Sequence, residues 1–459
     1  MRRTLMLAAV VVCVCASSVH AQVVQRPSRP YRGLFGGGPP PDPNRVRQTL
    51  TLTASVLGGH VDYSQPPDTV PVTDTPTGFS TSTAATVDYF YGRAARSFSA
   101  VGNVLSVSYY RPTFDSIVGA DLNLDFASDL SRGSRFSVTQ SLAYEPTFIL
   151  GAFSALDADV PVGILPETGT GVGNGLIEQS SWSSATTANL SRQWNPRHST
   201  AGTVGYSQRT YLDRVGFDNK TWNAHIGHTG NLSRSVALDT TYQYSTTEMR
   251  QPIGGALPLS DQALEGSLTY TKRLSPTRQL LFGGGGGATY VQTELPLDRV
   301  ALDYWVPTAM ARVSLDFGRS WSVATDYRRS VSTLQGVSVA SYPGHSVSFR
   351  TDGTFGSRIE AALSGAFSNG EAGGGQDGGS YTAYSGTAQM RYALSRCCAA
   401  TVQYDYYHYR LSNFTILPLG FPPEYDRNAI RVGFTLWLPL YGSYGATEGR
   451  ARGRTGQAR

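Results

Sequence analysis

The chain has 459 residues, of which 40% are hydrophobic and 15% charged, and its formal net charge is +5 at pH 7. The basic excess comes from the two terminal segments, whereas the body between them is slightly acidic, which argues against a nucleic-acid groove. After the N-terminal leader, no stretch approaches the roughly 20 consecutive apolar residues that a membrane-spanning helix needs. A helical inner-membrane protein is therefore excluded.

Three terminal segments differ in composition from the body of the chain. Residues 1–21 join two arginines to a short apolar stretch and end in the small residue Ala21, which predicts a signal peptide cleaved after that residue. Residues 22–46 are rich in proline and glycine and predict a flexible periplasmic arm. Residues 442–459 are rich in glycine and arginine and predict a disordered basic tail.

A two-residue alternation of apolar and polar side chains recurs throughout residues 47–441. In Ile430–Leu440, every even position is large and apolar, whereas Arg431, Gly433 and Thr435 stand at odd positions. Successive side chains of a strand point to opposite faces, so such a segment has one apolar face and one polar face. We predict about eighteen strands, within a range of 16–20: 47–57, 82–92, 96–110, 116–127, 135–148, 182–194, 199–211, 219–230, 234–246, 262–273, 279–292, 302–317, 320–332, 345–355, 358–368, 381–394, 399–411 and 427–440.

The joins between these predicted strands alternate in length. Joins from an even to an odd strand are short, as at 195–198 and 275–278. Joins from an odd to an even strand are mostly longer, as at 58–81, 149–181 and 247–261. Short periplasmic turns opposite long external loops are typical of outer-membrane barrels, and an even number of strands places both termini on the periplasmic side.

These patterns predict an all-β fold, a transmembrane antiparallel up-and-down β-barrel of about 18 strands that occupies residues 47–441. Closure of the barrel removes the sheet edges, whose backbone groups lipid cannot satisfy. Barrels of 16 to 18 strands leave an aqueous channel rather than a packed interior. The polar face is therefore expected to line a lumen.

Charged side chains on the predicted polar face are the candidate functional residues. The first ten strands carry acids there, whereas the later strands mix arginines with acids. Such groups survive in a membrane wall only when they are hydrated or paired. The lumen-lining candidates, two of them aromatic, are Arg312, Asp326, Arg328, Arg350, Asp352, Arg391, Asp405, Tyr407, Arg431 and Trp437.

Two interpretations of this face stay open. The arginines and acids could create a transverse field that selects solutes, or they could form cross-strand pairs that only stiffen the wall. The rings of Tyr407 and Trp437, expected to point inward, could stack on sugar faces, or they could belong to the aromatic girdles at the membrane interfaces.

Sites for covalent chemistry are not indicated. His225 is predicted to point inward and His228 outward, so they do not form a metal-binding pair on one face. The run Gly283–Gly287 lacks the Gly-Lys-Ser/Thr of a phosphate-binding loop. We expect no cofactor, no metal and no enzymatic activity, with a barrel enzyme as the less favoured alternative.

The leader, the repeated alternation and the closing strand Ile430–Tyr441 resemble the bacterial outer-membrane β-barrels. Within that class, the proline- and glycine-rich arm, the size and the closing "RVGFTLWLPLYG" look like the porin-like barrels encoded beside exopolysaccharide clusters. The resemblance implies outer-membrane lipid, the assembly machinery and periplasmic export components as partners. Class members typically end on an aromatic residue, whereas this chain continues from Tyr441 to Arg459, so its insertion signal would be internal.

We therefore expect a porin-like channel in the outer membrane that passes solutes or a secreted polysaccharide without covalent chemistry. The opposing hypothesis is a structural or adhesive barrel that is plugged by its own loops.

Overall fold

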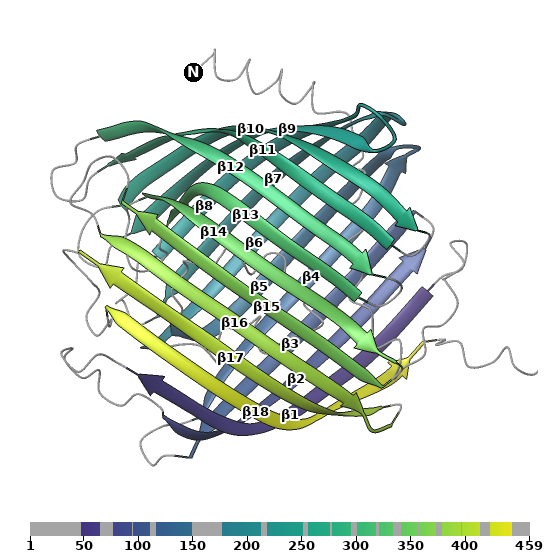
Figure 1. Ribbon diagram of the computed structural model, residues 1–459, viewed down its shortest axis with the longest axis vertical. Helices are drawn as coiled ribbons and strands as arrows, with labels where there is room; N and C mark the ends of the chain where they lie inside the picture. Colours follow the sequence, from purple (N-terminus) through teal and green to yellow (C-terminus); the bar gives the residue numbers. More distant parts are fainter. Residues whose placement is uncertain are drawn as a thin grey trace, which may run out of the picture.

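Eighteen β-strands form one antiparallel sheet that closes into a barrel (Figure 1). The computed structural model describes residues 47–64, 77–93, 95–110, 116–148, 177–212, 218–250, 256–275, 278–294, 301–317, 321–333, 341–356, 358–372, 379–395, 397–413 and 423–442. The predicted signal peptide, arm and almost all of the predicted tail lie outside these ranges.

The strands follow the chain in order, and each one pairs with its neighbours in the sequence. Their bounds are β1 (Arg47–Ser64), β2 (Gly78–Arg93), β3 (Arg96–Tyr109), β4 (Ile117–Ser131), β5 (Ser134–Phe148), β6 (Ile177–Asn195), β7 (His198–Tyr211), β8 (Asp218–Asn231), β9 (Val236–Arg250), β10 (Ala256–Ser275), β11 (Arg278–Glu294), β12 (Ala301–Phe317), β13 (Trp321–Thr333), β14 (Ser341–Phe355), β15 (Ile359–Glu371), β16 (Ser380–Ala393), β17 (Cys398–Ser412) and β18 (Glu424–Tyr441).

The barrel closes because β1 pairs with β18 as well as with β2. Ala54 stands opposite Leu436 across this seam, and Val56 stands opposite Phe434, so the apolar faces of the first and last strands are continuous. No strand among the described residues is left at an open edge. The predicted up-and-down barrel of about 18 strands is confirmed.

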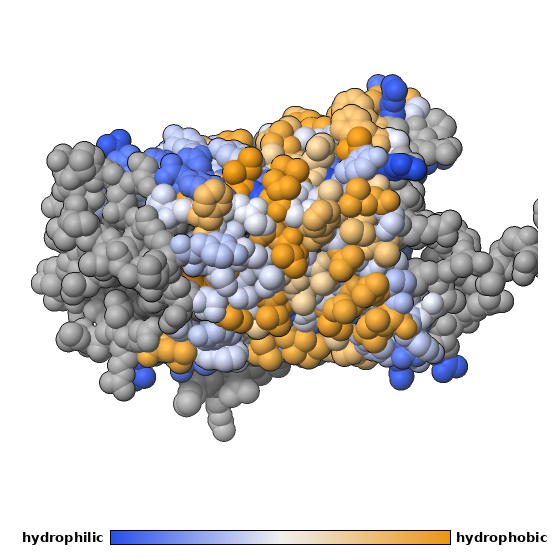
Figure 2. Space-filling view, turned by 90° about the horizontal axis from the view of Figure 1, so that it is seen from below, coloured by the Kyte–Doolittle hydropathy of each residue, from blue (hydrophilic) through white to orange (hydrophobic). Residues whose placement is uncertain are grey.

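The outer face of the barrel is apolar over a band that matches a membrane. On β18, the even-numbered residues from Ile430 to Leu440 are 40–57% exposed, whereas Arg431 between them is 3% exposed. At about 3.3 Å per residue this segment is roughly 33 Å long, and a strand tilt of about 40° reduces that to roughly 25 Å along the membrane normal. Figure 2 shows apolar side chains spread over the outer surface of the strands.

Outward-facing aromatic rings gather near the two ends of this band. Near the ends of the strands joined by long connections, aromatic pairs include Tyr206–Trp222 and Tyr290–Trp305, whose ring centroids are 4.4 and 5.0 Å apart. Near the opposite ends lies the pair Trp321–Phe355, at 4.6 Å. Such rings prefer the two membrane–water interfaces, so they mark the upper and lower limits of the lipid-facing wall.

Several strands are longer than predicted, and the predicted loops are correspondingly shorter. β1 continues to Ser64 instead of residue 57, β6 begins at Ile177 instead of 182, and β10 begins at Ala256 instead of 262. All three extensions lie at the end with the long connections. At that end the strands continue to pair beyond the aromatic rings. The outer face no longer contacts lipid there, so it does not have to be apolar, and the alternation from which strands are predicted is lost.

The inner face also differs from the predicted polar lining at that end. Its side chains include two buried apolar clusters. One contains Leu105 and Val107 on β3, and the other contains Met249, Leu259 and Val291 on β9, β10 and β11. The inner face is therefore apolar and packed at these two places near the long connections, and the predicted polar lining is interrupted there.

The alternation of the joins generates a prediction about orientation. Joins from even to odd strands span two to four residues, and joins from odd to even strands span five to 28. Epitope tags inserted within 150–175, a segment outside the described residues, should be accessible to antibody on intact cells. A tag at Asn195–His198, between β6 and β7, should be shielded until the outer membrane is opened. The reverse pattern of accessibility would show that the barrel has the opposite orientation in the membrane.

The two faces of β18 generate a second prediction. Leu436→Arg should impair membrane assembly, because an arginine on the lipid face near the bilayer midplane costs about 2–4 kcal/mol. Thr435→Arg should assemble better, because Thr435 points inward, where its hydroxyl lies 3.1 Å from that of Thr401. The measurement is the folded fraction, read from the shift in gel mobility on heating. Equal behaviour of the two variants would contradict the assigned register.

Candidate functional site

The predicted lumen-lining residues occupy six strands on one side of the barrel. Arg312 lies on β12, Asp326 and Arg328 on β13, Arg350 and Asp352 on β14, Arg391 on β16, Asp405 and Tyr407 on β17, and Arg431 and Trp437 on β18. In the alternation of their strands they stand on the face opposite to exposed apolar residues such as Val313, Met390 and Ile430, so all ten belong to the inner face. The structure divides them into an exposed group and a buried group.

The exposed group, on β12 to β14, is defined here as the arginine wall: Arg312, Arg328 and Arg350. Arg312 stands opposite Asp326 in the strand register, and its Nε lies 3.3 Å from the Asp326 Oδ1. Arg350 Nη2 lies 3.3 Å from Asp352 Oδ1. These pairs are partly exposed, so water screens them and each contributes little to stability, typically below about 1 kcal/mol.

Arg328 reaches further than its strand neighbours. Its Nη2 lies 3.8 Å from Glu265 Oε2 on β10, across β11 and β12. Gly287 stands opposite Glu265 on β11, so no side chain rises from the wall at that position. A glycine is also required there, because a Cβ on Gly287 would collide with the backbone of Leu264. Gly285, Gly286 and Gly287 thus allow close approach of the strands, and Gly287 keeps the inner wall flat beside Glu265.

The buried group lies on β16 to β18 and forms a hydrogen-bonded network. Arg431 Nη1 lies 3.3 Å from Asp405 Oδ2, with the two side chains only 3% and 9% exposed. Gln403 donates to the same carboxylate at 2.9 Å, and Thr387 donates to its other oxygen at 3.2 Å. The Asp405 carboxylate thus accepts hydrogen bonds from three side chains, which offsets the cost of burying its charge.

Arg391 belongs to the same buried face, where its Nη1 lies 3.8 Å from Glu360 Oε2 on β15. Arg427 on β18 is buried as well, although its position was not among the predicted site residues. The signal that would have found Arg427 is its odd position, since it shares the inward face of Arg431 and stands at the first residue of the predicted strand 427–440.

Tyr407 points inward as predicted, but its ring packs against other tyrosines. The ring centroids of Tyr407, Tyr409 and Tyr425 lie 5.6–6.1 Å from one another, and all three side chains are buried. Tyr404, on the opposite face, is exposed on the outer surface. Rings packed against one another in this way favour neither of the two interpretations left open for Tyr407, sugar stacking or an interfacial girdle.

The architecture places the protein in a class. Among the described residues, no helix is long and apolar enough to cross a membrane. The closed sheet, the apolar outer band and the aromatic rings at both of its limits define a transmembrane β-barrel of the bacterial outer-membrane type.

Comparisons with known proteins find similarity in structure but none in sequence. No protein-family model and no curated protein matches the sequence. Among solved structures, the chain is similar to OccAB4 of Acinetobacter baumannii, with a TM-score of 0.43 and 11% identity over 85% of this chain and 99% of that chain. It is similar to OccK5 (OpdH) of Pseudomonas aeruginosa, with a TM-score of 0.42 and 12% identity over 86% and 99%. The unliganded ferric citrate transporter FecA gives a TM-score of 0.43 and 12% identity over 85% of this chain and 64% of that chain.

The contrast between the two groups of ion pairs generates a prediction about stability. Asp405→Asn should destabilise the barrel by about 3–5 kcal/mol, because it leaves the buried Arg431 charge without its counter-charge. The matched control, Asp326→Asn in the exposed pair with Arg312, should cost less than about 1 kcal/mol. Urea unfolding of the barrel in lipid vesicles measures both. Comparable losses in the two variants would show that the buried network does not have the proposed role.

Proposed function

We propose that the protein is a porin-like channel whose water-lined path runs along the arginine wall and favours small anionic solutes. The observation that carries this proposal is the partial exposure of three arginine side chains on the inner face at β12 to β14: 44% for Arg312, 51% for Arg328 and 29% for Arg350. A barrel of 18 strands has the circumference for such a path. Guanidinium groups stay charged and bind carboxylate and phosphate groups by paired hydrogen bonds.

The balance of exposure along the wall supports anion preference, although each arginine has an acidic partner. Glu265 is only 12% exposed in its side chain, whereas its partner Arg328 is 51% exposed. Arg312 is also more exposed than Asp326, at 44% against 34%. At the third pair the two exposures are nearly equal, 29% for Arg350 and 31% for Asp352. Two of the three guanidinium groups are therefore more open to a solute than their acidic partners, which favours anions.

Passage of a secreted polysaccharide has less support from the described residues. A neutral glycan would need aromatic faces or hydrogen-bonding groups along its path, and the inward tyrosines on β17 and β18 are buried against one another. An acidic glycan would find the same arginine wall as a small anion. Passage of a polysaccharide is supported only by the resemblance in the sequence. The exposed arginines favour anionic solutes, whether small molecules or acidic glycans.

A second candidate function, a barrel plugged by its own residues, is favoured by one observation. The inner face near the long connections carries buried apolar clusters on β2 to β4 and on β9 to β12. Inward-facing apolar side chains are not suited to an open, water-filled mouth. Ion conductance in planar lipid bilayers separates the two functions, because a plugged barrel gives no stepwise currents and a channel does.

The arginine wall generates a prediction about selectivity. The triple substitution Arg312→Gln, Arg328→Gln and Arg350→Gln should lower the anion-to-cation permeability ratio several-fold, because it leaves Glu265, Asp326 and Asp352 on the path. The reversal potential under a KCl gradient measures this ratio.

The matched control for the wall is Arg391→Gln in the buried group. This substitution should lower the unfolding temperature and leave the reversal potential of the surviving channels unchanged. If the triple variant conducts with unchanged selectivity, the arginine wall does not line the path. If the unmodified protein is electrically silent, the channel proposal fails as a whole.

A further inference from the structure

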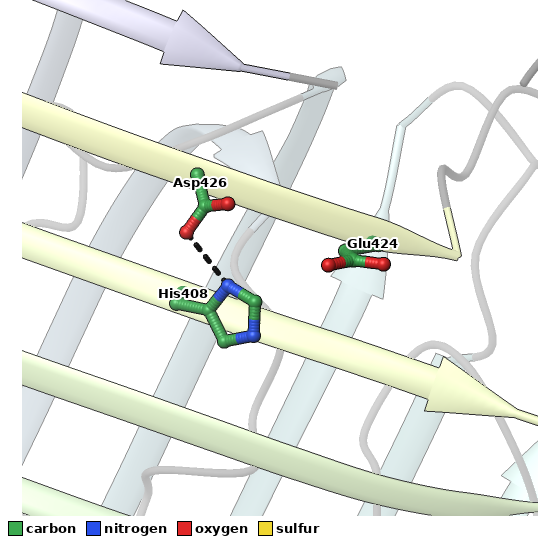
Figure 3. Close-up of side chains that lie close together, drawn as sticks. All are labelled: His408, Glu424 and Asp426. Atoms are coloured by element: carbon green, nitrogen blue, oxygen red, sulfur yellow. Dashed lines mark hydrogen bonds and ion pairs between the residues drawn. The ribbon is translucent and has the colours of Figure 1, made fainter. Parts of the chain in front are cut away.

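Three metal-ligating side chains meet on the outer surface of β17 and β18. His408 lies on β17, Glu424 and Asp426 lie on β18, and one ligand atom from each lies within 4.8 Å of the others. Figure 3 shows the imidazole of His408 directed toward the two carboxylates from the neighbouring strand. The sequence alone predicts no metal site because these residues are separated along the chain and meet only through the strand register, in which His408 stands opposite Asp426.

The position of this cluster on the barrel makes it accessible to ions. The exposed Tyr404 marks the limit of the apolar band on β17, since its partner in the register is Ile430, where the apolar stretch of β18 begins. His408 and Asp426 lie beyond that level, toward the long connection between β17 and β18. Their side chains are 16% and 35% exposed. The cluster therefore lies at or outside the headgroup level, where water and ions reach it.

The chemistry of the cluster is that of a transition-metal ligand set. One imidazole and two carboxylates match the three protein ligands that zinc takes in open sites, where water or another ligand fills the fourth position. Imidazole suits zinc, copper and nickel, whereas magnesium and calcium prefer oxygen ligands alone. The presence of His408 between two acids thus distinguishes the cluster from an ordinary acidic surface.

The present contacts hold the ligands near the required arrangement. His408 Nδ1 lies 2.7 Å from Asp426 Oδ1, and the Tyr406 hydroxyl donates to the same oxygen at 3.3 Å. Arg410 Nε lies 3.4 Å from Glu424 Oε2, so this carboxylate has to leave an exposed ion pair. Two ligands of one zinc ion lie at most about 4 Å apart, so the side chains have to close by about one ångström.

We propose that His408, Glu424 and Asp426 form a divalent transition-metal site of the zinc type that links β17 to β18 on the outer surface. The site lies beside the seam of the barrel, because Asp426 also stands opposite Ser64 of β1 in the strand register. A metal held by two strands at this place stabilises the folded barrel next to the point where its first and last strands join.

Binding of Zn²⁺ to the purified full-length protein tests the site. The protein carries no polyhistidine tag, is treated with EDTA and dialysed, and is titrated with Zn²⁺ in detergent by calorimetry. We expect one equivalent of zinc per chain. His408→Gln and Asp426→Asn should each weaken binding by about tenfold or more, since even the loss of a group behind the ligands costs 10–100-fold.

The matched control is His345→Gln. His345 faces outward on β14 near the same end of the barrel, but its Nδ1 is 2.8 Å from the Tyr327 hydroxyl instead of a carboxylate. This variant should bind zinc like the unmodified protein. Loss of binding in the control, or full binding in His408→Gln, would place the zinc elsewhere and overturn the proposal.

The thermal unfolding of the barrel gives a second readout, independent of calorimetry. Zn²⁺ should raise the unfolding temperature of the unmodified protein and of His345→Gln, but not that of His408→Gln, whereas Mg²⁺ should raise none of them. If His408→Gln lowers the unfolding temperature in EDTA and zinc has no effect on the unmodified protein, the three side chains form only a hydrogen-bonded cluster. A zinc effect that Mg²⁺ reproduces would equally contradict the proposed ligand set.

Discussion

The continuous ladder of backbone hydrogen bonds around the barrel is the constraint on which the rest of the structure depends. Lipid offers no partner for backbone N–H and C=O groups, so every strand must pair on both sides and β1 must meet β18. At this seam, Gly59 stands opposite Arg431 and Gly433 stands opposite Leu57. A Cβ on either glycine would collide with the opposing backbone. The glycines thus allow the two ends of the sheet to approach closely enough to complete the ladder.

Closure also fixes which charges face inward, and local burial then decides what each charge can do. Around Arg431 and Asp405 the surroundings are dry, so their attraction is strong, but their removal from water is costly and has to be offset by the amide of Gln403. Around Arg312 and Arg328 water is present, so their pairing is weak and their charge remains available to a solute. The same residue type is therefore buried in ion pairs on β16 to β18 and partly open to water on β12 to β14, where the proposed path runs.

The number of strands and the direction of their side chains could be predicted from the sequence, because the requirement for one lipid-facing side imposes the alternation directly. That Leu436, at an even position, is exposed and Arg431, at an odd position, is buried follows from that requirement alone. The ends of β1 and β6 near the long connections could not be predicted, since no lipid imposes a pattern there. The partner of Arg328 could not be predicted either, because Glu265 lies three strands away and the contact depends on a flat wall at Gly287. The packing of Tyr407 against Tyr425 depends on the register between β17 and β18, which the alternation within a single strand does not encode.

The apolar clusters of the inner face limit where selectivity can arise. They lie near the long connections, on β2 to β4 and on β9 to β12, and offer no charge to a solute. Arg312 and Arg350, in contrast, lie toward the short-turn ends of β12 and β14. In the proposed channel, a solute would pass the apolar clusters and the arginines at different levels of the wall. Arg328 lies near the middle of β13, between these levels. Because water screens charges beyond about 10 Å at moderate ionic strength, each arginine would act only on a solute close to its own level, whereas the apolar clusters would act through the width that they leave.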